Sequence, residues 1–168
     1  EIGGSLVGSE MCIRDSASLT GSSITIQLGS SVIAETNSIF SNGAELTITN
    51  TGTIEATNSK AINVSNSDGV SITNNKNGVI KSNNNTILGD AGTGADNVTI
   101  DNSGEIYTTA TGTESSAIVF ANNDTGNTIT NNSGGEIYSS GSESTIVLGV
   151  SSTLTNSGSI KNNKSVTN

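Results

Sequence analysis

The sequence predicts an all-β protein, a right-handed single-stranded parallel β-helix (β-solenoid) of about five to six coils, each of about 26 residues with three short strands. Three observations support this prediction. One short phrase recurs along the chain, its apolar residues alternate with polar ones, and no helical pattern separates its copies.

The recurring phrase is TITNTGTIEA (47–56) and its variants. Its first apolar residue recurs at spacings of 24, 28, 29 and 25 positions, at Ile48, Ile72, Ile100, Ile129 and Leu154. An asparagine lies two residues after each of these positions, at Asn50, Asn74, Asn102, Asn131 and Asn156. A glycine follows, with an isoleucine two residues beyond it, at Ile54, Ile80, Ile106, Ile137 and Ile160.

A third apolar segment closes each unit. It is AINV at 61–64, TILG at 86–89, AIVF at 117–120 and TIVL at 145–148, and we expect SVTN at 165–168 to close the last unit. The segment ITIQLGSSVIAETNSIF (24–40) has the same three apolar segments without the asparagine, and it predicts an earlier, more degenerate coil.

The alternation predicts strands whose alternate side chains face inward. In VTIDN, Val98 and Ile100 lie on one face and Thr99 on the other. About 26 residues hold too little chain for three antiparallel strands and a return, so each strand should pair in parallel with its equivalent one coil away, about 4.8 Å distant. Crossovers between parallel strands are right-handed. The asparagines should point inward at the corner and form a hydrogen-bonded ladder.

Composition excludes several classes of partner. The net charge of -9 and pI near 4.1 disfavour nucleic acid and anionic membrane surfaces, and we expect a monomer.

No apolar run approaches the length of a membrane span, and no charged-then-apolar signal segment opens the sequence. The chain lacks His, Pro and Trp and has one Cys, so no disulfide framework or thiolate metal site is expected.

Residues 10–16 read EMCIRDS and contain the sole Met, Cys and Arg of the chain. The codons GAG-ATG-TGT-ATA-AGA-GAC-AG encode this string, and they match a transposase end sequence used in library preparation. We therefore interpret residues 1–16 as adaptor-derived and not as native structure, and Cys12 and Arg14 are not taken as site residues. Residues 17–168 form the predicted repeat domain, a fragment of a longer chain.

No catalytic, cofactor-binding or metal-binding residue is predicted. General acid–base chemistry would fall to Asp, Glu, Lys or Tyr, and the acids are scattered. Glu105 and Glu136 share a register position before the tyrosines Tyr107 and Tyr138, and their expected role is a solvated outer face. The loop GDAGTGADN (89–97) places Asp90 and Asp96 around glycines, which could wrap calcium, but two acids are few for that role.

Outward threonines form a possible T-x-T column, in pairs such as Thr47/Thr49 and Thr128/Thr130. A flat, unbroken column of this kind would favour ice binding. We expect Asp101, Gln27 and the varying coil lengths to interrupt it, and the β-propensity of threonine explains the pairs more simply.

The phrase TNSGxI followed by AIxV, repeated at loose intervals in Thr/Asn/Gly-rich sequence, resembles the passenger region of bacterial autotransporters (type V secretion) over about residues 17–168. The resemblance implies a β-helix displayed at, or released from, the bacterial surface, and a translocator barrel that this sequence does not contain. The expected function is a structural stalk in an adhesin-like passenger, with a surface or host ligand such as a carbohydrate. The alternatives are a carbohydrate-binding or polysaccharide-cleaving β-helix with active loops elsewhere, and an ice-binding solenoid.

Overall fold

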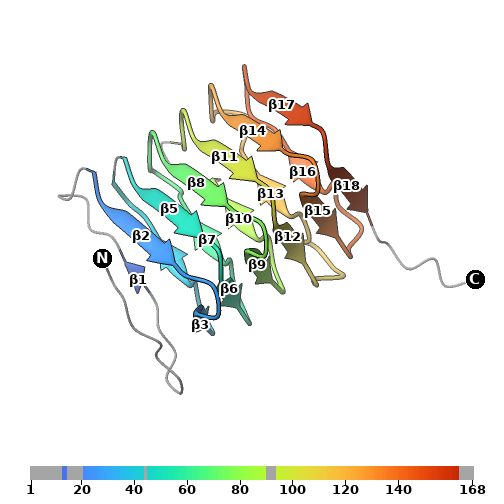
Figure 1. Ribbon diagram of the computed structural model, residues 1–168. Coiled ribbons are helices and arrows are strands. Elements are labelled where there is room, and N and C mark those ends of the chain that lie inside the picture. The colour runs from blue at the N-terminus through green and yellow to red at the C-terminus, as the bar shows by residue number, and fades with distance from the viewer. Residues whose placement is uncertain (1–12, 15–20, 44, 90–93, 163–168) are drawn as a thin grey trace, which may run out of the picture.

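The computed structural model describes residues 13–14, 21–43, 45–89 and 94–162 (Figure 1). The regular structure in these residues consists of β-strands only, arranged as three parallel sheets of six strands each. Every pairing joins a strand to its equivalent one coil away, so the predicted β-solenoid is confirmed. Among the described residues there is no helix of the length and apolar character that a membrane crossing requires.

We name the sheets A, B and C. Sheet B consists of β2 (Ser23–Ile26), β5 (Thr47–Asn50), β8 (Ser71–Asn74), β11 (Thr99–Asn102), β14 (Thr128–Asn131) and β17 (Thr153–Asn156). Sheet C consists of β3 (Ser31–Ala34), β6 (Thr53–Ala56), β9 (Val79–Ser82), β12 (Glu105–Thr108), β15 (Glu136–Ser139) and β18 (Ser159–Asn162). Sheet A has shorter strands: β1 (Ile13–Arg14), β4 (Ile39–Phe40), β7 (Ile62–Asn63), β10 (Ile87–Leu88), β13 (Ile118–Val119) and β16 (Ile146–Val147).

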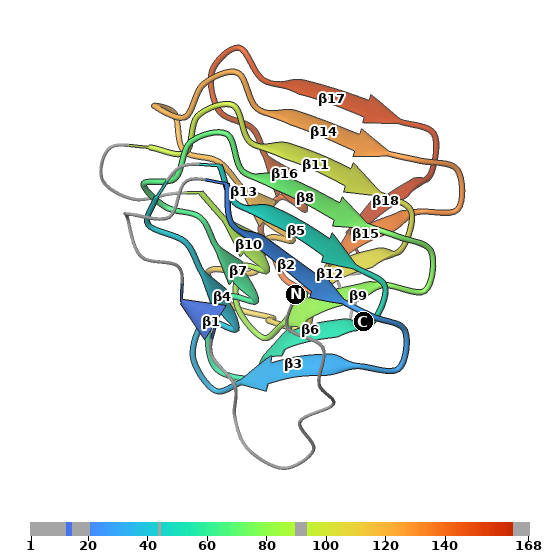
Figure 2. The ribbon, with the colours of Figure 1, turned by 60° about the vertical axis from the view of Figure 1, so that its left-hand side comes forward.

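The chain runs through sheet B, then sheet C, then sheet A in each coil. In Figure 2, which brings the N-terminal end forward, the path turns clockwise as it recedes, so the solenoid is right-handed as predicted. Five complete coils extend from β2 to β16, and β17 and β18 begin the next. The early unit at 24–40 supplies β2, β3 and β4, while 165–168 lies outside the described residues.

Within the predicted adaptor, residues 1–16, the structure describes only Ile13 and Arg14. They form β1, whose register partners are Ile39 and Phe40 of β4. The assignment of residues 1–16 to an adaptor stays a prediction.

Columns made mainly of isoleucine fill the interior, because equivalent inward positions of successive coils carry the same residue type or a similar one, such as Val32 in β3 and Leu154 in β17. In sheet B, Ile48, Ile72, Ile100 and Ile129 have no exposed surface. Sheet C contributes a matching column, and sheet A a third, which runs through Ile39, Ile62, Ile87 and Ile118. The core thus grows by repetition, and its hydrophobic stabilisation does not depend on large aromatic side chains.

The asparagine ladder lies at the corner between sheets B and C. Asn50, Asn74, Asn102 and Asn131 are fully buried. Each donates from Nδ2 to Oδ1 of the asparagine in the next coil, over 2.9, 2.8, 2.8 and 2.8 Å, the last bond reaching Asn156. The same Nδ2 atoms also reach backbone carbonyl groups, as in the bond from Asn50 to the Val79 oxygen over 3.2 Å. The predicted ladder is confirmed.

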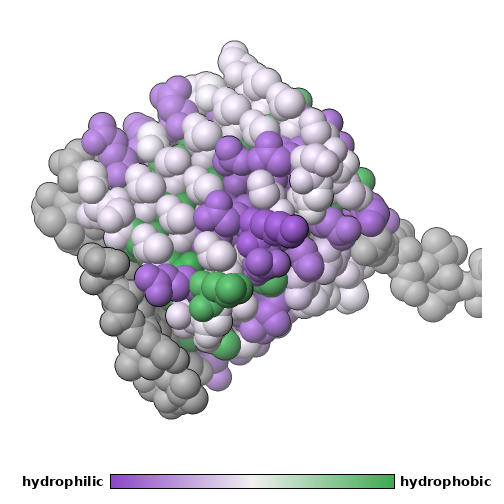
Figure 3. All heavy atoms as spheres, viewed as in Figure 1, coloured by the Kyte–Doolittle hydropathy of each residue, from purple (hydrophilic) through white to green (hydrophobic). Residues whose placement is uncertain are grey.

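Variation in coil length is confined to the corners. The anchor residues Ile72 and Ile100 are 28 positions apart and Ile48 and Ile72 only 24, yet both pairs are direct register partners in sheet B. The extra residues enter the turns and loops between strands, and the strands keep four residues in sheets B and C. Each sheet therefore presents outward side chains in straight columns along the solenoid. Figure 3 shows the outer face of sheet B as rows of near-white spheres.

Candidate functional site

The outer face of sheet C carries the most varied chemistry of the three sheets. Its outward positions form two columns in register along the solenoid. The first column is Ser31, Thr53, Val79, Glu105, Glu136 and Ser159. The second column is Ile33, Glu55, Lys81, Tyr107, Tyr138 and Lys161. Acids, lysines and tyrosines thus lie on one face of adjacent coils.

An ion pair joins two adjacent coils in the second column. Nζ of Lys81 lies 3.0 Å from Oε2 of Glu55, and both side chains are about a quarter exposed. The hydrogen bond to Glu55 raises the pKa of Lys81 above its usual 10.5, against the opposing effect of burial. The Lys81 ammonium group therefore stays protonated at neutral pH.

The two tyrosines of the chain stack on each other in the next two coils. The ring centroids of Tyr107 and Tyr138 are 4.5 Å apart and the ring planes differ by 7°. The Tyr138 hydroxyl donates to Oε2 of Glu105 over 3.5 Å, a long bond. Burial raises the pKa of the Tyr138 phenol well above its usual 10.0, with further contributions from Tyr107 and Glu105.

A groove of about 250 Å³ runs beside the second column, at its edge toward sheet A. Its lining includes the Tyr107 ring, the Glu55–Lys81 pair, and three polar side chains from the corner, Thr57, Asn83 and Thr109. One aromatic wall and several hydrogen-bonding groups in an open groove are features of sites that bind polar, partly apolar ligands.

A second hollow of about 240 Å³ lies at the opposite edge of sheet C. It includes Lys76, Glu105 and Glu136 together with the backbone of the turns at Gly78 and Gly104. Glu136 also lies 3.9 Å from Nζ of Lys161, so its carboxylate has a cation on the neighbouring coil. Glu55 and Glu136 of this face are thus each paired with a lysine of the neighbouring coil, whereas Glu105 accepts from the Tyr138 hydroxyl.

Lys81 and Tyr138 act on this face as hydrogen-bond donors. Lys81 is held in its ammonium form and Tyr138 in its phenol form, so neither is available as a base near neutral pH. Both are good hydrogen-bond donors, and Glu55 and Glu105 are acceptors that already accept from them.

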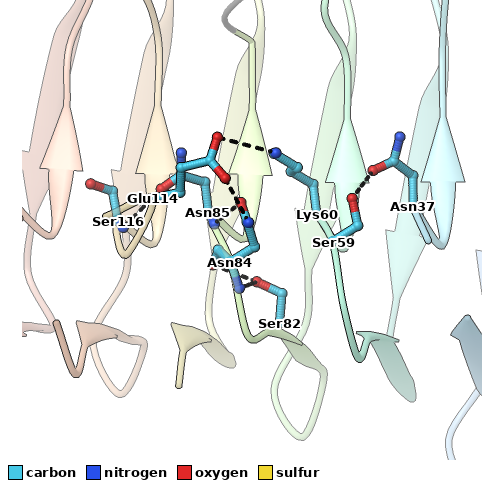
Figure 4. Close-up of polar contacts among 8 residues, drawn as sticks. All are labelled: Asn37, Ser59, Lys60, Ser82, Asn84, Asn85, Glu114 and Ser116. Carbon is cyan, nitrogen blue, oxygen red and sulfur yellow. Dashed lines mark hydrogen bonds and ion pairs between the residues drawn. The ribbon is translucent and has the colours of Figure 1, made fainter. Parts of the chain in front are cut away.

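A second polar cluster lies at the corner between sheets C and A and spans three coils (Figure 4). Glu114, in the long corner segment 109–116, has a φ of 57°, and its carboxylate reaches back along the solenoid. It accepts from Nδ2 of Asn84 over 2.8 Å and lies 3.5 Å from Nζ of Lys60. These contacts lower the pKa of Glu114, the Asn84 hydrogen bond most and Lys60 next. The contacts of Glu114 with Asn84 and Lys60 thus link three adjacent coils, and we call this cluster the Glu114 brace.

The acids near the loop 89–97 are bonded to backbone groups. Oδ1 of Asp96 accepts from the Thr125 N–H over 2.7 Å. The fully buried Asp124 accepts from the N–H groups of Ala95 and Ala121 over 2.8 and 2.7 Å. Within the described residues, no three His, Cys, Asp or Glu side chains are grouped to hold a metal ion. Asp90 lies outside the described residues.

The sequence placed Glu105 and Glu136 correctly, since they are direct register partners on the outer face, as are Tyr107 and Tyr138. It missed Lys81, Glu55 and the corner residues of the groove. The position directly after each sheet C isoleucine could have revealed Glu55 and Lys81, because it contains Glu55, Lys81, Tyr107, Tyr138 and Lys161, but it gives no signal for the corner residues.

No family model, curated protein or solved structure matches this chain.

Proposed function

We propose that this chain is a structural stalk, a stiff display segment of a bacterial autotransporter passenger exposed at the cell surface. The observation that carries the proposal is the continuity of the solenoid. Three sheets and the isoleucine columns run through all the coils without a break, and the asparagine ladder runs with them from Asn50 to Asn156. A segment built this way holds its two ends apart.

The expected stiffness of the solenoid comes from the contacts between successive coils. Each coil contacts its neighbours through three parallel strand pairings, so its stability is the sum of similar interfaces along the axis. Sideways bending would have to open backbone hydrogen bonds on one side and compress packed isoleucines on the other. Interiors packed to crystal-like density resist such compression.

The proposed surface location rests on the resemblance of the repeated TNSGxI and AIxV phrases to autotransporter passengers, and the acidic composition fits it. The net charge is -9. Charged surfaces of one sign stay soluble and repel one another, which suits a protein displayed at high density.

Surface labelling tests the proposal on the protein in its source cells. An antibody raised against this chain should label intact cells, and added protease should remove the label without permeabilisation. Label that appears only after the cells are permeabilised would place the chain inside and refute the proposal. A periplasmic protein released by outer-membrane disruption serves as the control for cell integrity.

A second candidate function is carbohydrate binding along sheet C. The specific observation that favours it is the groove beside Tyr107, which Glu55 and Lys81 of the two preceding coils also line. Sugars present hydroxyl groups and apolar ring faces, which Glu55, Lys81 and Tyr107 could contact together.

Two matched substitutions test this second function. Lys81→Met changes the groove, whereas Lys161→Met makes the same change in the same column outside it. Calorimetry with neutral and uronic-acid oligosaccharides should show binding that Lys81→Met weakens about tenfold or more and Lys161→Met leaves unchanged. Absence of heat with every oligosaccharide, or equal losses in both variants, would exclude the groove as a sugar site.

A further inference from the structure

The outer face of sheet B consists almost entirely of hydroxyl side chains. Its first outward column is Ser23, Thr47, Ser71, Thr99, Thr128 and Thr153. Its second column is Thr25, Thr49, Thr73, Asp101, Thr130 and Thr155. Nine threonines and two serines thus occupy eleven of the twelve positions, and Asp101 is the exception.

The structure corrects part of the expectation from sequence. Gln27 does not interrupt either column, because it lies beyond the end of β2. The varying coil length does not interrupt them either, since the added residues enter the corners and every pairing in sheet B keeps its register. Only the interruption at Asp101 is confirmed, between Thr73 and Thr130.

The hydroxyl groups of this face are not used to hold the fold together. Among the described residues, no hydrogen bond to another protein group involves the side-chain oxygen of any of the eleven. Hydroxyls elsewhere are engaged, as in the pairs Ser82–Thr86 and Ser139–Thr145 at 3.0 Å. The sheet B hydroxyls therefore have their donor and acceptor capacity free for water.

The β-propensity of threonine does not account for this composition. Sheet C has strands of the same length, in the same coils, with outward positions of the same kind. Propensity acts equally on both faces, yet sheet C holds Glu55, Lys81, Tyr107 and Val79 where sheet B holds threonine or serine. A cause specific to the sheet B surface is needed.

The spacing of the columns suits ordered water. Equivalent hydroxyls on adjacent coils are about 4.8 Å apart, and a water bonded to both at about 2.8 Å subtends an angle of roughly 118°, near the tetrahedral value. One water can therefore bridge each successive pair along a column. Threonine suits this role better than serine, because its branched Cβ restricts χ1 and fixes the hydroxyl direction.

The face is also unusually regular. Isolated sheets twist by about 20–25° per strand, but in Figures 1 and 2 the sheet B strands stay close to parallel from β2 to β17. Side-chain ladders are one cause of such flattening, and the asparagine ladder runs along the end of this sheet. A row of bridging waters would then continue over all six strands in the first column, and on either side of Asp101 in the second.

We propose that the outer face of sheet B binds ice, through files of water held in a tetrahedral arrangement between the threonine and serine columns. The near-white surface in Figure 3 fits this ligand, since charged groups would orient water in competing directions. This proposal is independent of the stalk function.

The test measures incorporation of the labelled, purified chain into a growing ice hemisphere, together with inhibition of ice recrystallisation. Thr73→Lys places a long charged side chain in the middle of the face. Thr53→Lys makes the same change at a half-exposed outward position of sheet C. We expect wild-type protein and Thr53→Lys to enter the ice, and Thr73→Lys to require about tenfold more protein for the same inhibition.

Asp101→Thr supplies a test in the opposite direction, because it completes the second column and should lower the concentration needed for inhibition. Circular dichroism on each variant verifies the β-structure. The proposal is overturned if ice excludes the wild-type chain, if Thr53→Lys loses as much activity as Thr73→Lys, or if Asp101→Thr gives no gain.

Discussion

Asn74 donates a hydrogen bond from Nδ2 to Oδ1 of Asn102 over 2.8 Å, although 28 residues separate the two in sequence. Asn102 in turn accepts from the N–H of Gly104 over 3.3 Å and donates to Asn131 over 2.8 Å. One side chain thus satisfies its own turn and links it to the turns on either side. The ladder couples local turn geometry to the register of the whole solenoid.

Replacing one inner member of the ladder should be costly. Asn102→Ala leaves the Gly104 N–H and Oδ1 of Asn131 without these partners in a fully buried corner. Unsatisfied buried groups of this kind should lower the free energy of unfolding by about 2–4 kcal/mol. Chemical denaturation monitored by circular dichroism measures the loss.

Asn156 provides the matched control, because it holds the same register position in the last described coil, where it is exposed. It accepts from Asn131 over 2.8 Å, but water can replace that bond. Asn156→Ala should therefore cost less than about 1 kcal/mol. Equal costs for the two variants would show that the ladder contributes no more than an exposed hydrogen bond.

The glycine after each ladder asparagine is required by close approach of the backbone. A Cβ on Gly104 would lie 2.2 Å from the Gly78 carbonyl oxygen and 2.6 Å from that of Asn75. Gly104→Ala should therefore destabilise the chain by about 2–4 kcal/mol. Gly112→Ala is the control, since a Cβ there meets no atom within 4 Å, and its effect should stay within about 0.5 kcal/mol. Similar denaturation midpoints for both variants would contradict this account.

The fold could be predicted from the sequence because the residues that determine it repeat. Ile72 and Ile100 recur with an asparagine two residues later, and each copy faces the same environment, so the pattern is reinforced in every coil. A parallel solenoid is one of few structures that can bury such short apolar segments using so few residues per unit.

The candidate site could not be predicted as readily, since it depends on positions that do not repeat. Glu55, Lys81 and Tyr107 differ from coil to coil, and their meeting depends on register, which brings residues 26 positions apart into contact. The brace through Glu114 depends on the conformation of a corner insertion, for which the repeat supplies no template.

The brace at Glu114 should make a small, pH-dependent contribution to stability. Its folded pKa lies below the usual 4.5, so the stabilisation is fully present above pH 4.5 and is lost as the pH falls through the folded pKa. Wild type should exceed Glu114→Gln in unfolding free energy by at most about 1 kcal/mol near pH 7, since exposed pairs contribute little. Denaturation of both proteins at several pH values should show the difference shrink below pH 4.5.

Glu35→Gln is the control for Glu114→Gln. Glu35 is an exposed carboxylate with no ion pair within the described chain. Glu35→Gln removes a surface carboxylate without breaking an ion pair, so its unfolding free energy near pH 7 should stay within about 0.5 kcal/mol of wild type. A difference between wild type and Glu114→Gln that grows as the pH falls would reverse the sign and contradict the assignment of Glu114.

The tyrosine stack should be visible in an alkaline titration. Burial favours the neutral phenol of Tyr138, so the pKa of Tyr138 in the folded protein exceeds the usual 10.0. The neutral phenol therefore stabilises the folded state fully below pH 10.0. This stabilisation is lost as the pH rises toward the folded pKa. Tyr138→Phe should therefore remove the last part of the rise in phenolate absorbance that the folded wild type shows above pH 10.0. Tyr107→Phe should retain the late phase, because burial, the largest cause of the shift, persists when a phenyl ring replaces the phenol in the stack. If the wild type instead titrates in a single phase centred at pH 10.0, solvent reaches the Tyr138 hydroxyl freely. Burial in the stacked pair would then not raise the pKa of Tyr138, and this prediction would be wrong.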